Sequence, residues 1–196
     1  MKLIERKSYL QKLIDVEGTP DIKVVTGVRR SGKSKLLEAF KHHVVSSDPD
    51  ANIIHVNFNL TEFEGLMEYH ALDEFVRAAY VPGASNYVII DEVQMCEGFE
   101  RAINSFHASE NFDIYITGSN AKLLSGELAT YLGGRYVEFV IYPFSFGEFM
   151  ELYRSIVPDA PIQQCFQKYL LAGGMPYLAN LRYADAPSKQ YLHDLF

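Results

Sequence analysis

Eight consecutive residues combine two glycines, a lysine and a hydroxyl group at a spacing that suits phosphate binding. The segment reads Gly27-Val28-Arg29-Arg30-Ser31-Gly32-Lys33-Ser34 and matches G-x-x-x-x-G-K-[ST] at every fixed position. Glycine permits the backbone conformations in which consecutive N–H groups surround a polyphosphate. The Lys33 ammonium can reach the β- and γ-phosphates, and the Ser34 hydroxyl can bind Mg²⁺. The segment therefore predicts a site for a nucleotide polyphosphate and its magnesium ion.

The residues around these fixed positions extend the predicted site. We predict that the nucleotide contacts Gly27, Arg30, Ser31, Gly32, Lys33, Ser34 and Lys35. Side chains between the two glycines often point away from the phosphates, so we expect Arg29 and Arg30 to be solvated or to contact a partner as readily as to bind the nucleotide. An ordinary turn with a solvated lysine is the alternative for the whole segment. A predicted strand before it and a predicted helix after it argue against that alternative.

Two acids follow a short apolar run later in the chain. Residues 87–90 read Tyr-Val-Ile-Ile, as in the central strand of a parallel sheet, and Asp91 and Glu92 come directly after them. Asp91 can hold Mg²⁺ directly or through water, and Glu92 can orient and deprotonate the water that attacks a γ-phosphoryl group. A strand that simply ends at polar residues is the alternative. The phosphate-binding pattern upstream favours the catalytic interpretation.

The elements that must position these residues alternate between strands and helices. Strands are expected at 22–28, 53–58, 87–90, 114–116 and 137–141, from short apolar runs bounded by turn residues. Helices are expected at 5–14, 34–45, about 70–80 and 99–108. This alternation predicts an α/β three-layer sandwich with parallel strands and with its sites at the carboxyl ends of the strands.

The pattern changes to helix alone after Pro158. A helix is expected at 162–172, followed by a break at Gly173–Pro176 and a second helical piece. We therefore expect a main domain at 1–157 and a helical appendage at 158–196, the start of a winged-helix-like region. The aromatic run at 142–149 lacks interleaved basic residues, so packing against the preceding strand is favoured over a platform for nucleic-acid bases.

The chain resembles the P-loop NTPases that have an additional central strand and a catalytic glutamate, in particular AAA-like prokaryotic ATPases related to the archaeal ATPase and STAND groups. The resemblance covers most of the chain. It rests on the segments 24–34, Ile89–Gln94, Ile116–Asn120, Gly134-Arg135 and Gly173–Pro176, together with the helix at 5–13. It implies a five-stranded, mainly parallel sheet in which the first strand is flanked by the fourth and the fifth. Related ATPases commonly carry a longer C-terminal extension, whose activities are not assigned to this chain.

The same resemblance implies two further site residues. Thr117–Asn120 is similar to the segment in which a polar side chain contacts the γ-phosphate or the attacking water, and Ser119 or Asn120 is the expected residue. A glycine-containing turn and a helix N-cap is the alternative. Arg135 is similar to the arginine that stabilises charge in the transition state, in the same chain or from a neighbouring subunit. A surface arginine is the alternative.

The amino-acid composition limits which binding partners and which cellular location are expected. The chain has 196 residues, 48% of them hydrophobic, and a net charge of -7, so DNA is possible as a partner but has no support from the charge. Cys96 and Cys165 lie far apart, which indicates two core thiols in a reducing cytoplasm. No apolar run approaches the roughly 20 residues that cross a bilayer, so no membrane is expected. A protein partner or self-association is expected.

These observations predict an enzyme that hydrolyses ATP with Mg²⁺ to drive a conformational change in itself or in a partner. ATP is preferred because the guanine-selective sequence Asn-Lys-x-Asp is absent. The alternative is a nucleotide-gated switch with negligible turnover without its partner. A small-molecule kinase is a third interpretation. Glu92 argues against it, because a base that activates water would favour hydrolysis over transfer of the phosphoryl group to another acceptor.

Overall fold

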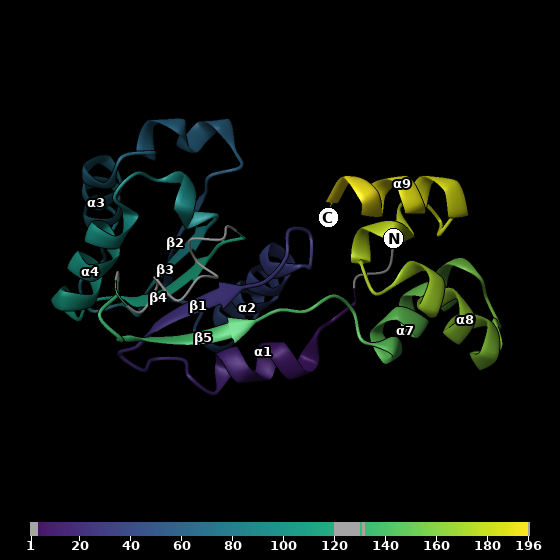
Figure 1. The fold of residues 1–196 in the computed structure, drawn as a ribbon. Helices are drawn as coiled ribbons and strands as arrows, with labels where there is room; N and C mark the ends of the chain where they lie inside the picture. The colour runs from purple at the N-terminus through teal and green to yellow at the C-terminus, as the bar shows by residue number, and fades with distance from the viewer. Residues whose placement is uncertain (1–3, 120–129, 131, 196) are drawn as a thin grey trace. The chain divides into compact units, whose positions relative to one another are not determined.

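A computed structural model describes residues 4–119, 130 and 132–195 (Figure 1). The chain divides into two compact units. The sheet unit consists of Ser8–Gly27 and Lys33–Val140, and the helical unit consists of Met1–Lys7, Val28–Gly32 and Ile141–Phe196. The segment 27–34 therefore contributes residues to both units.

The sheet unit contains five parallel strands. They are β1 (Ile22–Thr26), β2 (Asn52–Asn57), β3 (Asn86–Asp91), β4 (Asp113–Thr117) and β5 (Tyr136–Val140). Their order in the sheet is β2-β3-β4-β1-β5, and every neighbouring pair is parallel. The structure thus confirms the predicted α/β fold and the position of the first strand between the fourth and the fifth.

The register of the strands aligns their carboxyl ends. Asn57 pairs with Asp91, Ile90 with Ile116, and Val25 with Thr117. The last residues of β1, β3 and β4 therefore lie at one edge of the sheet. Polar side chains that end these strands can meet there, although they are distant in sequence.

Helices cover both faces of the sheet because apolar side chains of each strand alternate between the faces. On one face, α3 (Tyr69–Ala78) and α4 (Phe99–Ser109) bury Leu72, Val76, Ala102, Ile103 and Phe106 against Ile22, Val24, Val88, Ile90, Ile114 and Ile116. On the other, α2 (Lys33–Ser47) places Phe40 against the rings of Tyr115 and Tyr87. Among the described residues, the unit also contains α1 (Lys7–Ile14) and the 3-10 helices η1 (Thr61–Leu66) and η2 (Val93–Met95). The first residue of α1, Lys7, is grouped with the helical unit.

The helical unit has a separate core that is rich in aromatic rings. Its elements are α7 (Phe146–Ile156), α8 (Ile162–Ala172), the 3-10 helix η3 (Pro176–Ala179) and α9 (Asp185–Leu195). Phe149 stacks on Tyr153 with 5.5 Å between ring centroids, and it meets Tyr169 and Tyr183 edge-on. Residues 141–195 contain no strand. Of the helices in the described residues, none is long and apolar enough to cross a membrane.

The structure differs from the sequence prediction at α7. The aromatic run at 142–149 was expected to pack against the preceding strand, but Phe144, Phe146 and Phe149 pack in the core of the helical unit. The helix begins at a capping box in which the Ser145 hydroxyl accepts from the Glu148 N–H and the Glu148 carboxylate accepts from the Ser145 N–H. The longest segment of the helical unit begins at Ile141, whereas the expected boundary lies between residues 157 and 158.

Candidate functional site

The segment 27–34 connects β1 to α2. β1 ends at Thr26 and α2 begins at Lys33, so the motif has the strand–loop–helix context that phosphate binding requires. Gly27 has φ 138° and Gly32 has φ 103°, conformations that side-chain-bearing residues rarely adopt. A Cβ atom on Gly32 would meet no atom within 4 Å. Glycine is thus required at position 32 for backbone conformation, and the space beside it is open.

Two side chains of the segment are buried and polar. Lys33 is 4% exposed, and its Nζ donates to the Gly27 carbonyl oxygen at 3.1 Å, so the ammonium lies against the start of the loop. Ser31 is fully buried, and its hydroxyl has no hydrogen-bond partner among the described residues. An unsatisfied buried hydroxyl costs free energy. Both groups fit a phosphate ligand, because each could donate to its oxygens.

The other predicted nucleotide contacts point in different directions. Ser34 is exposed in the first turn of α2, where its hydroxyl is accessible to a metal ion. Lys35 is exposed and pairs with Glu38 at 2.7 Å on the same helix. Arg30 is exposed with φ 65°, and its guanidinium lies over the rings of Tyr177 and Tyr191.

A buried hydroxyl connects the two acids at the end of β3. Asp91 is 1% exposed, and its Oδ1 accepts a hydrogen bond from the Thr117 hydroxyl. The same Thr117 oxygen accepts from the Glu92 N–H at 3.0 Å. One side chain at the end of β4 therefore fixes the carboxylate of Asp91 and the backbone of Glu92.

The carboxylate of Glu92 is held on the same edge of the sheet. Glu92 has φ 58°, a left-handed conformation that costs about 1–3 kcal/mol unless its surroundings stabilise it. Its Oε2 accepts from the Ser119 hydroxyl at 2.9 Å and also from the Gln94 amide. The structure thus brings together three predicted residues, Asp91, Glu92 and Ser119.

Two residues of this arrangement were not singled out from the sequence. Thr117 was only part of the expected polar segment at 117–120, and Gln94 was only part of the resemblance. Part of the signal for Thr117 was available, because a hydroxyl residue ends a predicted strand, but its place beside β3 comes from the sheet order in the structure. Gln94 lies in η2, whose 3-10 turn was not predicted.

Of the two remaining predicted residues, only Arg135 is described, and it is not brought to this edge. Asn120 lies outside the described residues. Arg135 is exposed and precedes β5, and its carbonyl oxygen accepts from the N–H of Ile22, the first residue of β1. Arg135 therefore lies at the amino ends of the strands, roughly 13 Å of strand away from the end of β1. Its expected role within the same chain is not supported by this placement.

Comparisons with known proteins agree with this architecture. A family model described as an AAA domain matches residues 19–150, more than half of the chain. An uncharacterised protein of Haemophilus influenzae is 39% identical over 191 residues, and the match covers 96% of this chain and 47% of that protein. The chain spans about half the length of the curated relatives it matches.

Solved structures show the same fold at low sequence identity. PCH-2 of Caenorhabditis elegans matches with a TM-score of 0.61 and 14% identity, covering 92% of this chain and 59% of that one. Domain III of the replication initiation protein DnaA from Thermotoga maritima matches with a TM-score of 0.53 and 15% identity, covering 100% and 93%. The chain belongs to the AAA domain family of P-loop NTPases.

Proposed function

We propose that this chain binds ATP with Mg²⁺ through the segment 27–34 and hydrolyses it, and that hydrolysis drives a conformational change in the protein or in a partner. The observation that carries the proposal is the pair Asp91-Glu92 at the carboxyl edge of the sheet, with the Glu92 carboxylate hydrogen-bonded to Ser119. Family membership supports nucleotide binding. Hydrolysis rests on the chemistry of these residues.

Each residue has a distinct task in this reaction. Lys33 can exchange its hydrogen bond to the Gly27 carbonyl oxygen for one to a phosphate oxygen, and so offset the charge that develops on the γ-phosphoryl group. Glu92 accepts a proton from the attacking water. Ser34 and Asp91 would hold Mg²⁺, which neutralises phosphate charge and aligns the β- and γ-phosphates when bound.

One observation favours a second function, a nucleotide-gated switch with low turnover. Both the Ser119 hydroxyl and the Gln94 amide donate to Oε2 of Glu92. A carboxylate that already accepts two hydrogen bonds is less available to a water molecule. In this alternative, a partner would release Glu92 from its donors, and the ATP-bound state would itself be the signal.

A role for Arg135 would require a second copy of the chain. Its place at the amino ends of β1 and β5 keeps it away from Gly27, which follows the carboxyl end of β1 in the same sheet unit. An arginine on a neighbouring subunit can supply transition-state stabilisation in trans. We therefore propose self-association as the arrangement in which Arg135 would act.

The test is phosphate release from Mg-ATP by the wild type, Glu92→Gln and Glu97→Gln, with ATP affinity measured on the same samples. Glu97 is an exposed glutamate five residues from Glu92, so Glu97→Gln is a matched control for loss of one carboxylate. We expect Glu92→Gln to bind ATP and to lose hydrolysis by about 10²–10⁴-fold. Glu97→Gln should behave as the wild type.

The other outcomes separate the alternatives. If the wild type and Glu92→Gln bind ATP and neither hydrolyses it, the switch is favoured. If Glu92→Gln hydrolyses ATP as fast as the wild type, Glu92 is not the base. If Lys33→Ala leaves ATP affinity unchanged, the assignment of the phosphate loop is wrong.

A further inference from the structure

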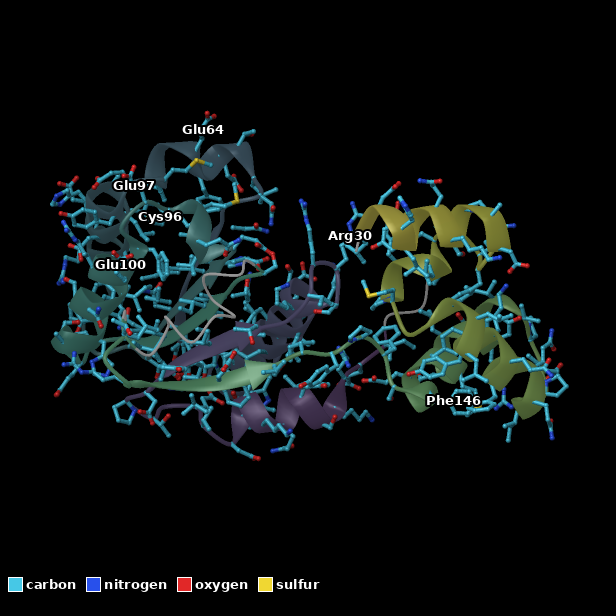
Figure 2. The ribbon with its side chains drawn as sticks, in the orientation of Figure 1. Arg30, Glu64, Cys96, Glu97, Glu100 and Phe146 are labelled. Carbon is cyan, nitrogen blue, oxygen red and sulfur yellow. The ribbon has the colours of Figure 1, made fainter. Side chains whose placement is uncertain are left out.

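One arginine of the phosphate loop is engaged with aromatic rings far along the chain. The Arg30 Cζ lies 4.5 Å from the ring centroid of Tyr177 in η3 and 5.6 Å from that of Tyr191 in α9. The two rings stack on each other with centroids 4.6 Å apart. All three residues belong to the helical unit, and the Arg30 side chain, labelled in Figure 2, lies beside α9.

This contact coincides with an unfavourable backbone conformation. Arg30 has φ 65°, in the left-handed region that residues other than glycine usually avoid. A left-handed residue inside a loop turns successive N–H groups toward one side, and such a concave row of N–H groups binds anions. A cation–π contact changes an equilibrium by a factor of about 2 to 30, depending on how far it is desolvated. The aromatic rings are therefore able to offset part of the cost of the left-handed loop.

A second arginine fixes the next residue of the loop to the same unit. Arg6 is 7% exposed, and its Nη1 donates to the carbonyl oxygens of Ser31 at 3.2 Å and Tyr142 at 2.8 Å. Its Nε donates to Glu148 Oε1 at 2.9 Å. Residues 30 and 31 are thus anchored by independent contacts immediately before Gly32 and Lys33, while the neighbouring Arg29 is exposed.

We propose that Tyr177 and Tyr191 are positioning residues for nucleotide binding, because they hold Arg30 in the conformation that turns the loop N–H groups toward the phosphates. The inference rests on the proposed function. It assigns Arg30 a role in shaping the loop, since a guanidinium that lies over two rings is not directed at a phosphate. By reciprocity of coupled equilibria, bound nucleotide must also stabilise η3 and α9.

The test measures Mg-ATP affinity by calorimetry for Tyr177→Leu and Tyr191→Leu. Each is expected to weaken binding by about fivefold, or about 1 kcal/mol. Tyr177→Phe keeps the ring and should restore most of the affinity. Tyr142→Leu is the matched control, because it removes an exposed tyrosine side chain of the same unit and keeps the backbone carbonyl oxygen that accepts from Arg6. Its affinity should equal that of the wild type.

A double-mutant cycle separates positioning from general destabilisation. Tyr177→Leu should cause no further loss of affinity in an Arg30→Ala background, whereas a purely structural defect would weaken binding equally in both backgrounds. Amide hydrogen exchange in residues 176–191 should slow when Mg-ATP is added, and Arg30→Ala should abolish that protection. This second measurement is independent of how stable each tyrosine variant is.

The outcomes distinguish this inference from the proposed function. If the wild type binds ATP, Lys33→Ala does not, and the leucine variants bind as the wild type does, the positioning role is overturned and the proposed function stands. The positioning role is also overturned if the losses of ATP affinity caused by Tyr177→Leu and Arg30→Ala are additive in the double mutant. If the wild type binds no ATP, both proposals fail together.

Discussion

Replacing Thr117 with valine removes the hydroxyl that connects the two acids while keeping the shape of the side chain. Thr117 is fully buried at the end of β4. The substitution leaves the buried Asp91 carboxylate without this donor and the Glu92 N–H without its acceptor. We therefore expect the sheet unit to lose stability although no cavity is created.

The size of the effect follows from the two lost hydrogen bonds. A bond to a charged acceptor contributes about 1.5–3 kcal/mol, and loss of the acceptor for the partly buried Glu92 N–H costs about 1 kcal/mol. The added methyl group returns up to about 0.8 kcal/mol of apolar burial. The net expected loss is about 2–4 kcal/mol, a factor of roughly 30 to 1,000 in the population of the unfolded unit.

Amide hydrogen exchange measured by mass spectrometry reports this loss for the sheet unit alone. Peptides that cover β3 and β4 should exchange about 30 to 1,000 times faster in Thr117→Val than in the wild type. Thr26→Val is the matched control, because Thr26 is also fully buried at the end of a strand but donates only to Glu138, whose side chain is exposed and can turn to water. Its expected cost is about 0–1 kcal/mol, or up to about a fivefold change.

The reasoning is refuted if exchange in β3 and β4 accelerates less than about fivefold in Thr117→Val, or if Thr26→Val accelerates it equally. The first result would mean that the hydroxyl contributes nothing net to the native state. The second would mean that any buried threonine at this edge has the same effect, so the connection between Asp91 and Glu92 would not be special.

Two further predictions concern the helical unit. Gly174→Ala should destabilise it by about 1–3 kcal/mol in thermal unfolding, because the new Cβ would lie 2.1 Å from the Phe144 carbonyl oxygen. Gly147→Ala has open space around it in α7 and should stabilise the unit by about 0.4–1 kcal/mol. Equal melting temperatures of the two variants would contradict this. Burial alone would raise the pKa of Glu148, but hydrogen bonds from Arg6 and Ser145 outweigh it and hold that pKa below its ordinary value. A lowered folded pKa contributes stability that is complete above the ordinary value and is lost as the pH falls through the folded value. Glu148→Gln should therefore cost about 1–2 kcal/mol at pH 7, and the difference should begin to shrink near the ordinary value of about 4 and vanish only below the lowered folded pKa. A difference that persists in stronger acid would show that the ion pair is not its source.

The sheet was predictable because each of its strands is a short apolar run between turn signals. The structure moves the strand bounds by one or two residues, as at β1, which ends at Thr26 instead of Val28. The burial of Lys23 could not be predicted from the apolar run in which it lies. Its ammonium is fully buried because it pairs with Asp113 at 2.5 Å on the neighbouring strand, and only the sheet order brings those two residues together.

The candidate site was predictable where one segment carries the chemistry and less so where several strands combine. The fixed positions of 27–34 and the pair Asp91-Glu92 are local patterns. Thr117, by contrast, acquires its contacts because β4 lies beside β3 in register, a property of topology. The expectation for Arg135 rested on the resemblance to related ATPases, and the parallel pairing of β5 with β1 puts it at the opposite end of the strands.

The conformation of the phosphate loop depends on contacts with residues outside the motif. Its pattern requires glycine at two positions, yet Arg30 is also left-handed and carries a side chain. Such a residue keeps its conformation only if contacts outside the loop favour it. Those contacts come from Tyr177 and Tyr191, about 150 residues away, while Arg6 holds the Ser31 carbonyl oxygen. Because no spacing within the motif encodes these partners, the sequence predicts what the loop binds, and the tertiary structure determines how well it is shaped to do so.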